Sequence, residues 1–298
     1  MSEDLGFAFA LLVSGLSVGL MYSLIALGFV LVYKATEAIN FAQGEFVMLA
    51  GYIAAAALAA QGMPVIAAIL GAVLVMAAFG FALERVVLRP LLGRPIVAII
   101  MATIGLAAIL RGLPPLAFGA ETHALPLPVG DDPYIVGPAA IPPIQLLGVV
   151  VALGFLAYFT FFFMKSRMGV AMRAVADNQQ VAMAMGINVE RYFALAWAMA
   201  GVVSAAGGIL WGNMLGVDVQ LALVGLKVFP VVILGGLDSI VGAIVGGLIV
   251  GVVESLAAGY LDPYVGGGTK DFAPYVLMIV ALMFTPYGIF GERKIERV

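Results

Sequence analysis

Long apolar stretches alternate with short polar clusters along almost the whole chain. The apolar stretches recur in windows of about 20 residues, the length that one α-helix needs to cross the hydrocarbon of a membrane. Spans can be drawn at about residues 8–33, 44–61, 64–83, 96–113, 144–164, 191–212, 223–237, 240–260 and 272–290. The pattern predicts an all-α, polytopic membrane helix bundle of about nine (8–10) transmembrane helices, in a single domain that covers residues 1–298.

The composition supports a membrane protein. Of the 298 residues, 64% are hydrophobic and 10% are charged, whereas a soluble domain is about half apolar and a quarter charged. The first 30 residues lack a basic segment and a small-residue cleavage site, so they read as a first span rather than a signal peptide. The bundle is expected to contact membrane lipid on its outer faces.

Lysine and arginine predict the orientation, because cytoplasmic loops carry an excess of both. If the N-terminus faces outward, 11 of the 14 basic residues fall on the cytoplasmic side, and Arg111, Lys227 and Lys270 fall on the outer side. The cytoplasmic set is Lys34, Arg85, Arg89, Arg94, Lys165, Arg167, Arg173, Arg191, Arg293, Lys294 and Arg297. The prediction is therefore N-out and C-in.

Two loops are larger than turns. Eight of the 15 prolines lie in an outer loop at about residues 114–143, which is the natural place for an external contact. A cytoplasmic loop at about residues 165–190 reads as short helix, turn, short helix, with Gly186 able to end the second helix.

The apolar cluster Ala182 to Met185 in the cytoplasmic loop permits two interpretations. It can form an interfacial helix that lies on the membrane. It can also insert into a groove on a cytoplasmic motor protein, which is the favoured hypothesis. The candidate coupling residues are Arg167, Arg173, Asp177, Ala182, Met183, Ala184 and Gly186.

Polar residues near and inside the spans suggest two further sites. Asn40, Gln43 and Glu45 have the spacing of a helix cap, and a broken helix could also expose them to a translocation path. Lys227 and Glu254 lie at similar depth, since each residue of a helix rises by about 1.5 Å. An unpaired charge inside a membrane is costly, so we predict a structural ion pair between them.

Several functions are disfavoured. The chain has no cysteine and one histidine, His123, which is expected to be a solvated loop residue, so neither a metal site nor a catalytic set can be assembled. No basic run suits nucleic acid. No phosphate-binding Gly-x-x-x-x-Gly-Lys-Ser/Thr motif occurs, so any ATP hydrolysis needs a separate ATPase and no cofactor is expected.

Three stretches together resemble a known family: Ile39-Asn-Phe-Ala-Gln-Gly-Glu-Phe46, the loop from Arg167 to Asn188, and Val232-Ile-Leu-Gly-Gly-Leu-Asp-Ser-Ile-Val-Gly242. The resemblance is to the permease subunits of high-affinity branched-chain amino-acid ABC transporters. It implies that the cytoplasmic loop docks on the ATPase. The wider importer pattern of Glu-Ala-Ala followed by Gly aligns with Gln180, Val181, Ala182 and Gly186, so its glutamate and one of its two alanines are replaced here.

The resemblance also implies an assembly and a substrate. A type II importer-like permease would pair with a related permease as a heterodimer, two cytoplasmic ABC ATPases and an extracytoplasmic solute-binding protein, in the bacterial inner membrane. Branched-chain amino acids are the expected solutes, with urea, amides or other amino acids as alternatives. An ion-coupled secondary transporter is a less favoured function. Spans one to four and six to nine are a possible inverted repeat.

Overall fold

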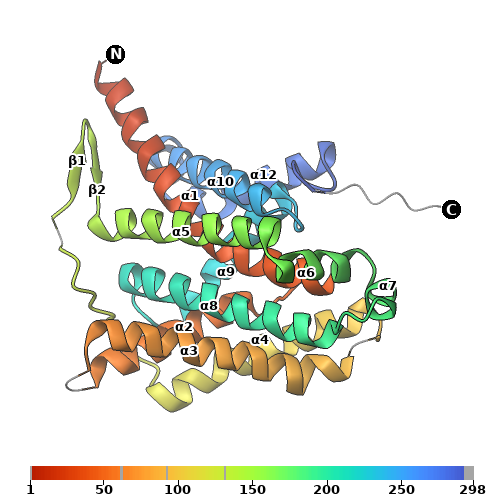
Figure 1. The fold of residues 1–298 in the computed structure, drawn as a ribbon. Helices are drawn as coiled ribbons and strands as arrows, with labels where there is room; N and C mark the ends of the chain where they lie inside the picture. The colour runs from red at the N-terminus through yellow and green to blue at the C-terminus, as the bar shows by residue number, and fades with distance from the viewer. Residues whose placement is uncertain (1, 61–62, 92, 131, 292–298) are drawn as a thin grey trace. The chain divides into compact units, whose positions relative to one another are not determined.

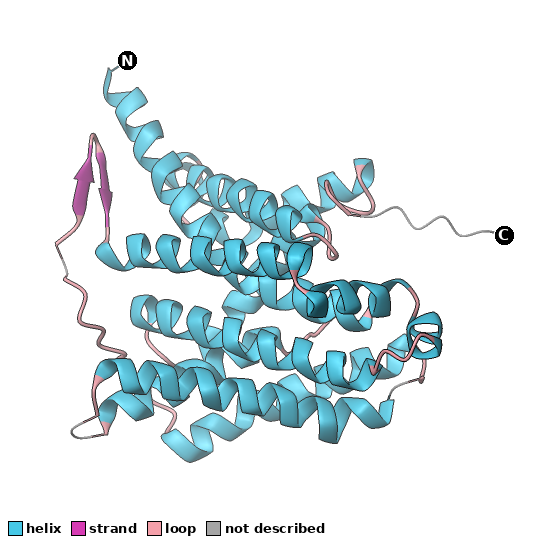
Figure 2. Ribbon diagram, viewed as in Figure 1, coloured by secondary structure: helices cyan, strands magenta, loops and turns pink. Residues whose placement is uncertain are grey.

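The apolar stretches form long helices in a computed structural model, which describes residues 2–60, 63–91, 93–130 and 132–291 (Figures 1 and 2). The elements in chain order are α1 (Ser2–Thr36), α2 (Gln43–Ala59), α3 (Val65–Leu83), the π-helix η1 (Glu84–Leu88), the 3₁₀-helix η2 (Arg89–Leu91), α4 (Ile96–Phe118), β1 (Tyr134–Val136), β2 (Ala139–Ile141), α5 (Pro143–Lys165), α6 (Arg167–Asp177), α7 (Gln179–Ala184), α8 (Val189–Leu215), the 3₁₀-helix η3 (Val219–Ala222), α9 (Leu223–Gly235), α10 (Ile240–Tyr260), α11 (Asp262–Val265) and α12 (Thr269–Phe284).

The expectation of an all-α chain is wrong in one detail. The Pro-rich loop contains a hairpin of two three-residue strands, β1 and β2, which pair antiparallel with Tyr134 opposite Ile141 (magenta in Figure 2). The loop also begins later than predicted, because Pro114 and Pro115 lie inside α4, which ends at Phe118.

Six helices among the described residues are long and apolar enough to cross a membrane. They are Asp4–Thr36, Val65–Leu91, Ile96–Phe118, Pro143–Lys165, Val189–Leu215 and Ile240–Tyr260. The predicted second and seventh spans correspond to the shorter apolar helices Gln43–Ala59 and Val219–Gly235. The chain is thus a multi-pass membrane protein, while the count of nine crossings stays a prediction.

Internal contacts divide the chain into two compact units. The first unit comprises Met1–Ala26, Val129–Leu156 and Lys227–Val298, and the second comprises Leu27–Pro128 and Ala157–Leu226. Each unit is described separately below.

In the second unit, α3 and α8 run antiparallel in close backbone contact. A Cβ atom added at Gly80 would lie 2.2 Å from the carbonyl oxygen of Trp197, and one added at Gly201 would lie 2.2 Å from that of Met76. Small residues allow helices to approach in this way where lipid removes the hydrophobic driving force. The buried core beside this contact includes Phe46 and Trp197.

The helix α2 begins beside the middle of α8. The Gln43 amide reaches Ser204 near the centre of the 27-residue α8, and a Cβ atom at Gly208 would lie 2.3 Å from the Val47 carbonyl oxygen. The two helices therefore run parallel. Before α2, the chain leaves α1 at Glu37, which has a left-handed φ of 54°, and residues 38–42 lack helical structure.

In the first unit, the glycine-rich face of α10 packs on α1. A Cβ atom at Gly251 would lie 2.3 Å from the Gly15 carbonyl oxygen, and one at Gly247 would lie 2.5 Å from that of Gly19. The Ser23 hydroxyl donates a 2.9 Å hydrogen bond to the Gly19 carbonyl of its own helix. The glycines of α10 thus have a packing role within this chain.

Candidate functional site

A buried polar cluster surrounds the start of α2. The Asn40 amide donates to the Gln43 side-chain oxygen at 3.2 Å, and the Gln43 amide donates to the Ser204 hydroxyl at 2.9 Å. The main-chain N–H of Phe41 donates to the hydroxyl of Thr103 on α4 at 3.3 Å. Asn40, Gln43, Thr103 and Ser204 are all fully buried. The non-helical chain before α2 therefore satisfies its polar groups against α4 and α8, as irregular backbone at membrane depth must.

The capping-box interpretation of this segment is wrong. Helix α2 begins at Gln43 with Ala42 as its N-cap, and no side chain caps it. Asn40 instead bonds the main-chain N–H of Ala42 at 3.0 Å and the side chain of Gln43. Glu45 does lie in the first turn of α2, where the helix dipole favours an acid.

Glu45 forms an ion pair that the charge count along the sequence does not reveal. Its carboxylate is 3% exposed and accepts from the guanidinium of Arg111 on α4. The positive-inside count places Arg111 at the outer end of the predicted span 96–113, and it lies seven residues before the end of α4 at Phe118. The Arg111 side chain remains 50% exposed in the isolated chain. A half-exposed guanidinium within an apolar helix needs water, lipid headgroups or another protein beside it, because hydrocarbon is a poor environment for a charge.

The loop predicted to be cytoplasmic folds into the two short helices α6 and α7 (Figure 1). Ser166 caps α6 by accepting from the Gly169 N–H at 2.8 Å, and Asn178 caps α7 by accepting from the Val181 N–H at 3.0 Å. Gly186, with a φ of 81°, follows α7, and Asn188 caps α8. Both short helices pack on α8.

The predicted coupling residues do not share one environment. The exposed residues are Arg167, Arg173, Asp177, Met183, Ala184 and Gly186. Ala182 is only 3% exposed, so its prediction as part of an exposed apolar cluster is wrong. The exposed apolar side chains of this segment are Val181, Met183 and Met185, at 58%, 56% and 77%. Ala182 instead holds α7 in place by packing inward.

The predicted intramembrane charges come together in the first unit. The Lys227 Nζ atom lies 3.3 Å from Glu254 Oε1 and 2.7 Å from Asp271 Oδ1. Tyr22 lies close enough to Glu254 for a side-chain hydrogen bond. Asp271 is a third member of this charged cluster, and it was not predicted from the sequence. The predicted ninth span starts one residue later, at residue 272. Lys227 thereby links α9, α10 and α12.

His123 is not a solvated loop residue. Its main chain pairs with Val217 through two 2.9 Å hydrogen bonds, and its ring lies edge-on to Tyr52 with centroids 5.7 Å apart. The Nε2 atom is shielded from solvent. The histidine therefore anchors the Pro-rich loop to the chain after α8. No group of three or more candidate ligands for a metal occurs in the described ranges.

Comparison with known proteins identifies the chain. The family model of the branched-chain amino acid transport system / permease component matches residues 11–284. The chain belongs to this permease family. It is 34% identical to the high-affinity branched-chain amino acid transport system permease protein LivH of Salmonella typhimurium, with 100% of both chains covered. It is also 34% identical to the corresponding BraD of Pseudomonas aeruginosa, over 96% of this chain and 97% of that protein.

More distant similarities extend over most of the chain. The probable branched-chain amino acid transport permease protein LivH of Methanocaldococcus jannaschii is 30% identical over 92% of this chain and 90% of its own length. Among solved structures, PsaBC from Streptococcus pneumoniae in complex with Fab has a TM-score of 0.48 and 14% identity, over 95% of this chain and 94% of that chain. The relatives named here are transport permeases rather than enzymes.

Proposed function

We propose that this permease forms half of the translocation channel of an ATP-driven importer for branched-chain amino acids in the bacterial inner membrane. The relatives named above supply the substrate class, since LivH and BraD carry that description. The observation that carries the ATP-driven part is the apolar surface of the α6–α7 segment. Its Val181, Met183 and Met185 side chains are exposed, and neither short helix is among the described helices that are long enough to cross a membrane. A separate ATPase would bind this segment, as an apolar helix face binds a groove.

The proposed topology has nine crossings with the N-terminus outside and the C-terminus inside. It is supported by the basic residues Lys34, Arg85, Arg94, Lys165 and Arg173, which would all face the cytoplasm. Arg293, Lys294 and Arg297, counted in the same set, lie outside the described residues. In this frame the α6–α7 segment is cytoplasmic and the β1–β2 hairpin faces the solute-binding protein. A related permease subunit and two ATPases complete the assembly.

The coupling proposal is tested by a charge on the exposed face of α7. Met183→Asp should prevent the ATPase from binding or reduce solute-stimulated ATP hydrolysis to the basal rate, whereas Met183→Leu keeps an apolar side chain and should behave as wild type. Both quantities are measured on the complex purified by a tag on the permease. The coupling role is wrong if Met183→Asp retains full assembly and full stimulation. Ala182 is unsuitable for this test because a larger side chain there would disturb packing.

The translocation path is proposed to run beside the start of α2, with Asn40, Gln43, Glu45 and Arg111 near it. The half-exposed Arg111 supports this proposal, as does the start of α2 midway along α8. Transporters build their sites from such interrupted helices near the membrane midplane. In this proposal the Glu45–Arg111 ion pair borders the path rather than only joining α2 to α4.

Single and double neutral variants separate a path from a purely structural pair. Glu45→Gln and Arg111→Gln each leave one charge uncompensated, which should lower thermal stability. The double variant removes both charges and should recover stability. If the pair borders the path, solute uptake stays low in the double variant although its stability returns. Recovery of both stability and uptake in the double variant would assign the pair a structural role alone.

The transport activity itself is tested in proteoliposomes with the partner permease, the ATPases and the solute-binding protein. Labelled leucine should accumulate only when ATP and the binding protein are both supplied. Accumulation of urea or amides in place of leucine would show that the permease transports a different class of solute. Leucine uptake that needs an ion gradient and no ATP would support a secondary transporter.

A further inference from the structure

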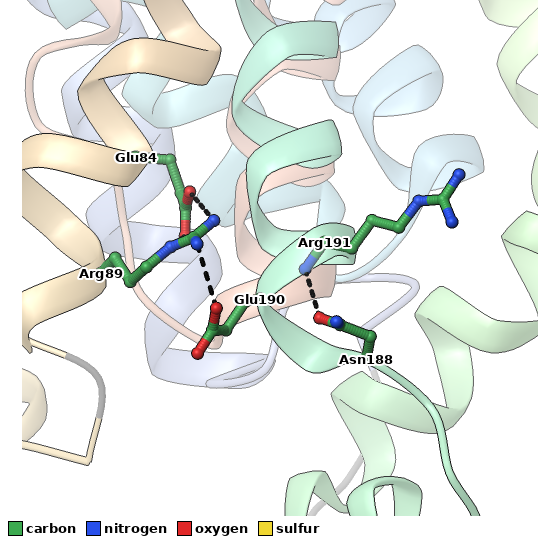
Figure 3. A network of polar contacts seen from close by, with 5 residues as sticks. All are labelled: Glu84, Arg89, Asn188, Glu190 and Arg191. Atoms are coloured by element: carbon green, nitrogen blue, oxygen red, sulfur yellow. Dashed lines mark hydrogen bonds and ion pairs between the residues drawn. The ribbon is translucent and has the colours of Figure 1, made fainter.

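Arg89 joins two acidic residues that lie far apart in the sequence (Figure 3). Its Nη2 atom lies 3.0 Å from Glu84 Oε2, and its Nε atom donates to Glu84 Oε1 at 3.4 Å. Its Nη1 atom lies 3.0 Å from Oε2 of Glu190 on α8. A guanidinium has the fork geometry needed to hold one carboxylate with two donors while a third donor binds another.

A π-helical turn creates the Glu84–Arg89 pair. In an α-helix, residues five apart differ in direction by about 140°, since each residue turns the helix by about 100°. The segment Glu84–Leu88 is instead a π-helix, in which the Arg89 N–H bonds the Glu84 carbonyl five residues earlier. The wider turn brings residues 84 and 89 to one face. Glu84 is buried at 1% exposure, so this arm of the network is part of the protein interior.

The Glu190 arm lies at the start of α8. Glu190 is in the first turn of α8, two residues after the cap Asn188, and is 56% exposed. The coupling segment α6–α7 ends at Ala184, five residues before α8 begins. A displacement of α7 therefore reaches α8 at the turn that Arg89 holds.

The same two helices are in backbone contact further along. Gly80 of α3 meets Trp197 of α8, and Gly201 of α8 meets Met76 of α3. The glycine contacts set the distance between α3 and α8. The contact between Arg89 and Glu190 sets how the end of α3 aligns with the start of α8. Arg89 thus closes the α3–α8 pair at the end nearest the coupling segment.

We propose that Arg89 is a positioning residue for energy coupling: through Glu190 it ties the start of α8 to the π-turn after α3, so that α3 follows when the coupling segment moves. The inference rests on the proposed function. It adds a route from the α6–α7 segment into the membrane helices that does not depend on the polar cluster at α2. The π-turn is part of this device because it presents the buried Glu84 to Arg89.

Glu190→Gln is the variant that isolates this role. It removes the negative charge of the exposed arm and leaves the Glu84–Arg89 pair intact, so the fold should survive. Arg191→Gln is the matched control, because Arg191 is the next residue, is exposed, and points away from Arg89 (Figure 3). Arg89→Lys keeps the charge but loses the fork, and should fall between Glu190→Gln and wild type.

The readout is solute imported per ATP hydrolysed by the complete complex in proteoliposomes. Glu190→Gln should lower this ratio by about 1.4- to fivefold, the range by which an exposed charged pair shifts an equilibrium. Complex assembly and basal ATP hydrolysis should match wild type, and so should the Arg191→Gln ratio. In nanodiscs, hydrogen exchange should rise at residues 84–88 in Glu190→Gln and stay at the wild-type level in Arg191→Gln.

The possible failures are distinguishable. An unchanged import ratio in Glu190→Gln, with a transporting wild type, overturns the positioning role. Loss of ATPase binding in Glu190→Gln would also overturn it, because Glu190 would then contact the motor directly. A wild-type complex that hydrolyses ATP without importing solute would instead refute the proposed function, and unchanged hydrogen exchange would refute the tie itself.

Discussion

Two glycines on the same helix, Gly80 and Gly71 of α3, allow the helix packing to be tested with one substitution. A Cβ atom at Gly80 would lie 2.2 Å from the Trp197 carbonyl oxygen and 2.8 Å from its carbon, and both are backbone atoms that cannot rotate away. Ordinary contact begins at 3.4 Å, so α8 would have to recede by roughly 1.2 Å. At Gly71 nothing lies within 4 Å.

Gly80→Ala should therefore destabilise the permease by about 1–3 kcal/mol, the usual cost of overpacking. Gly71→Ala should be neutral or stabilising by up to about 1 kcal/mol, because alanine favours a helix over glycine. Thermal unfolding of each purified variant in the same detergent, followed by loss of monodisperse protein, measures both effects. Equal melting temperatures for the two variants would refute the close α3–α8 contact.

Three further outcomes follow from buried or paired groups. Ser204→Ala leaves the buried Gln43 amide without its acceptor and should cost about 1–3 kcal/mol of stability in the same unfolding assay. Lys227→Gln leaves two carboxylates uncompensated and should lower the melting temperature, with partial recovery when either carboxylate is also neutralised. The hydrogen bonds from the side chain and main chain of Thr269 lower the pKa of Asp262, so their stabilisation is present above about pH 4. It is lost as the pH falls through the folded-state pKa, and Asp262→Asn should flatten this acid dependence of the melting temperature.

Much of the fold can be predicted from the sequence because each part depends on local order along the chain. Apolar windows predict the long helices, since lipid forces every buried backbone group into helical hydrogen bonds. The two short helices α6 and α7 follow from polar caps and an apolar face within one segment. The depth of a residue along a helix can also be counted from the sequence. This count predicts the Lys227–Glu254 pair, and the Lys227 Nζ atom lies 3.3 Å from Glu254 Oε1.

The remaining parts depend on how helices from distant segments meet. Arg111 lies near the outer end of a predicted span, and nothing in the sequence pairs it with Glu45, which is 66 residues earlier and on another helix. The Glu84–Arg89 pair is hidden because a regular α-helix would place the two side chains on different faces. Ala182 reads as part of an exposed cluster because a six-residue helix has no periodicity long enough to indicate its buried face.

The pairing of the intramembrane acids also bears on the energy source. An ion-coupled transporter needs membrane-embedded acids that can release and rebind the coupling ion. In the described helices, Glu45 is held by Arg111 and Glu254 by Lys227, so each of these acids already has a cation at the place where a coupling ion would bind. This arrangement favours ATP as the source of energy. Collapsing the proton and sodium gradients should therefore leave uptake by the reconstituted complex unchanged, whereas removing ATP should abolish it, and the opposite result would contradict the structural role of both pairs.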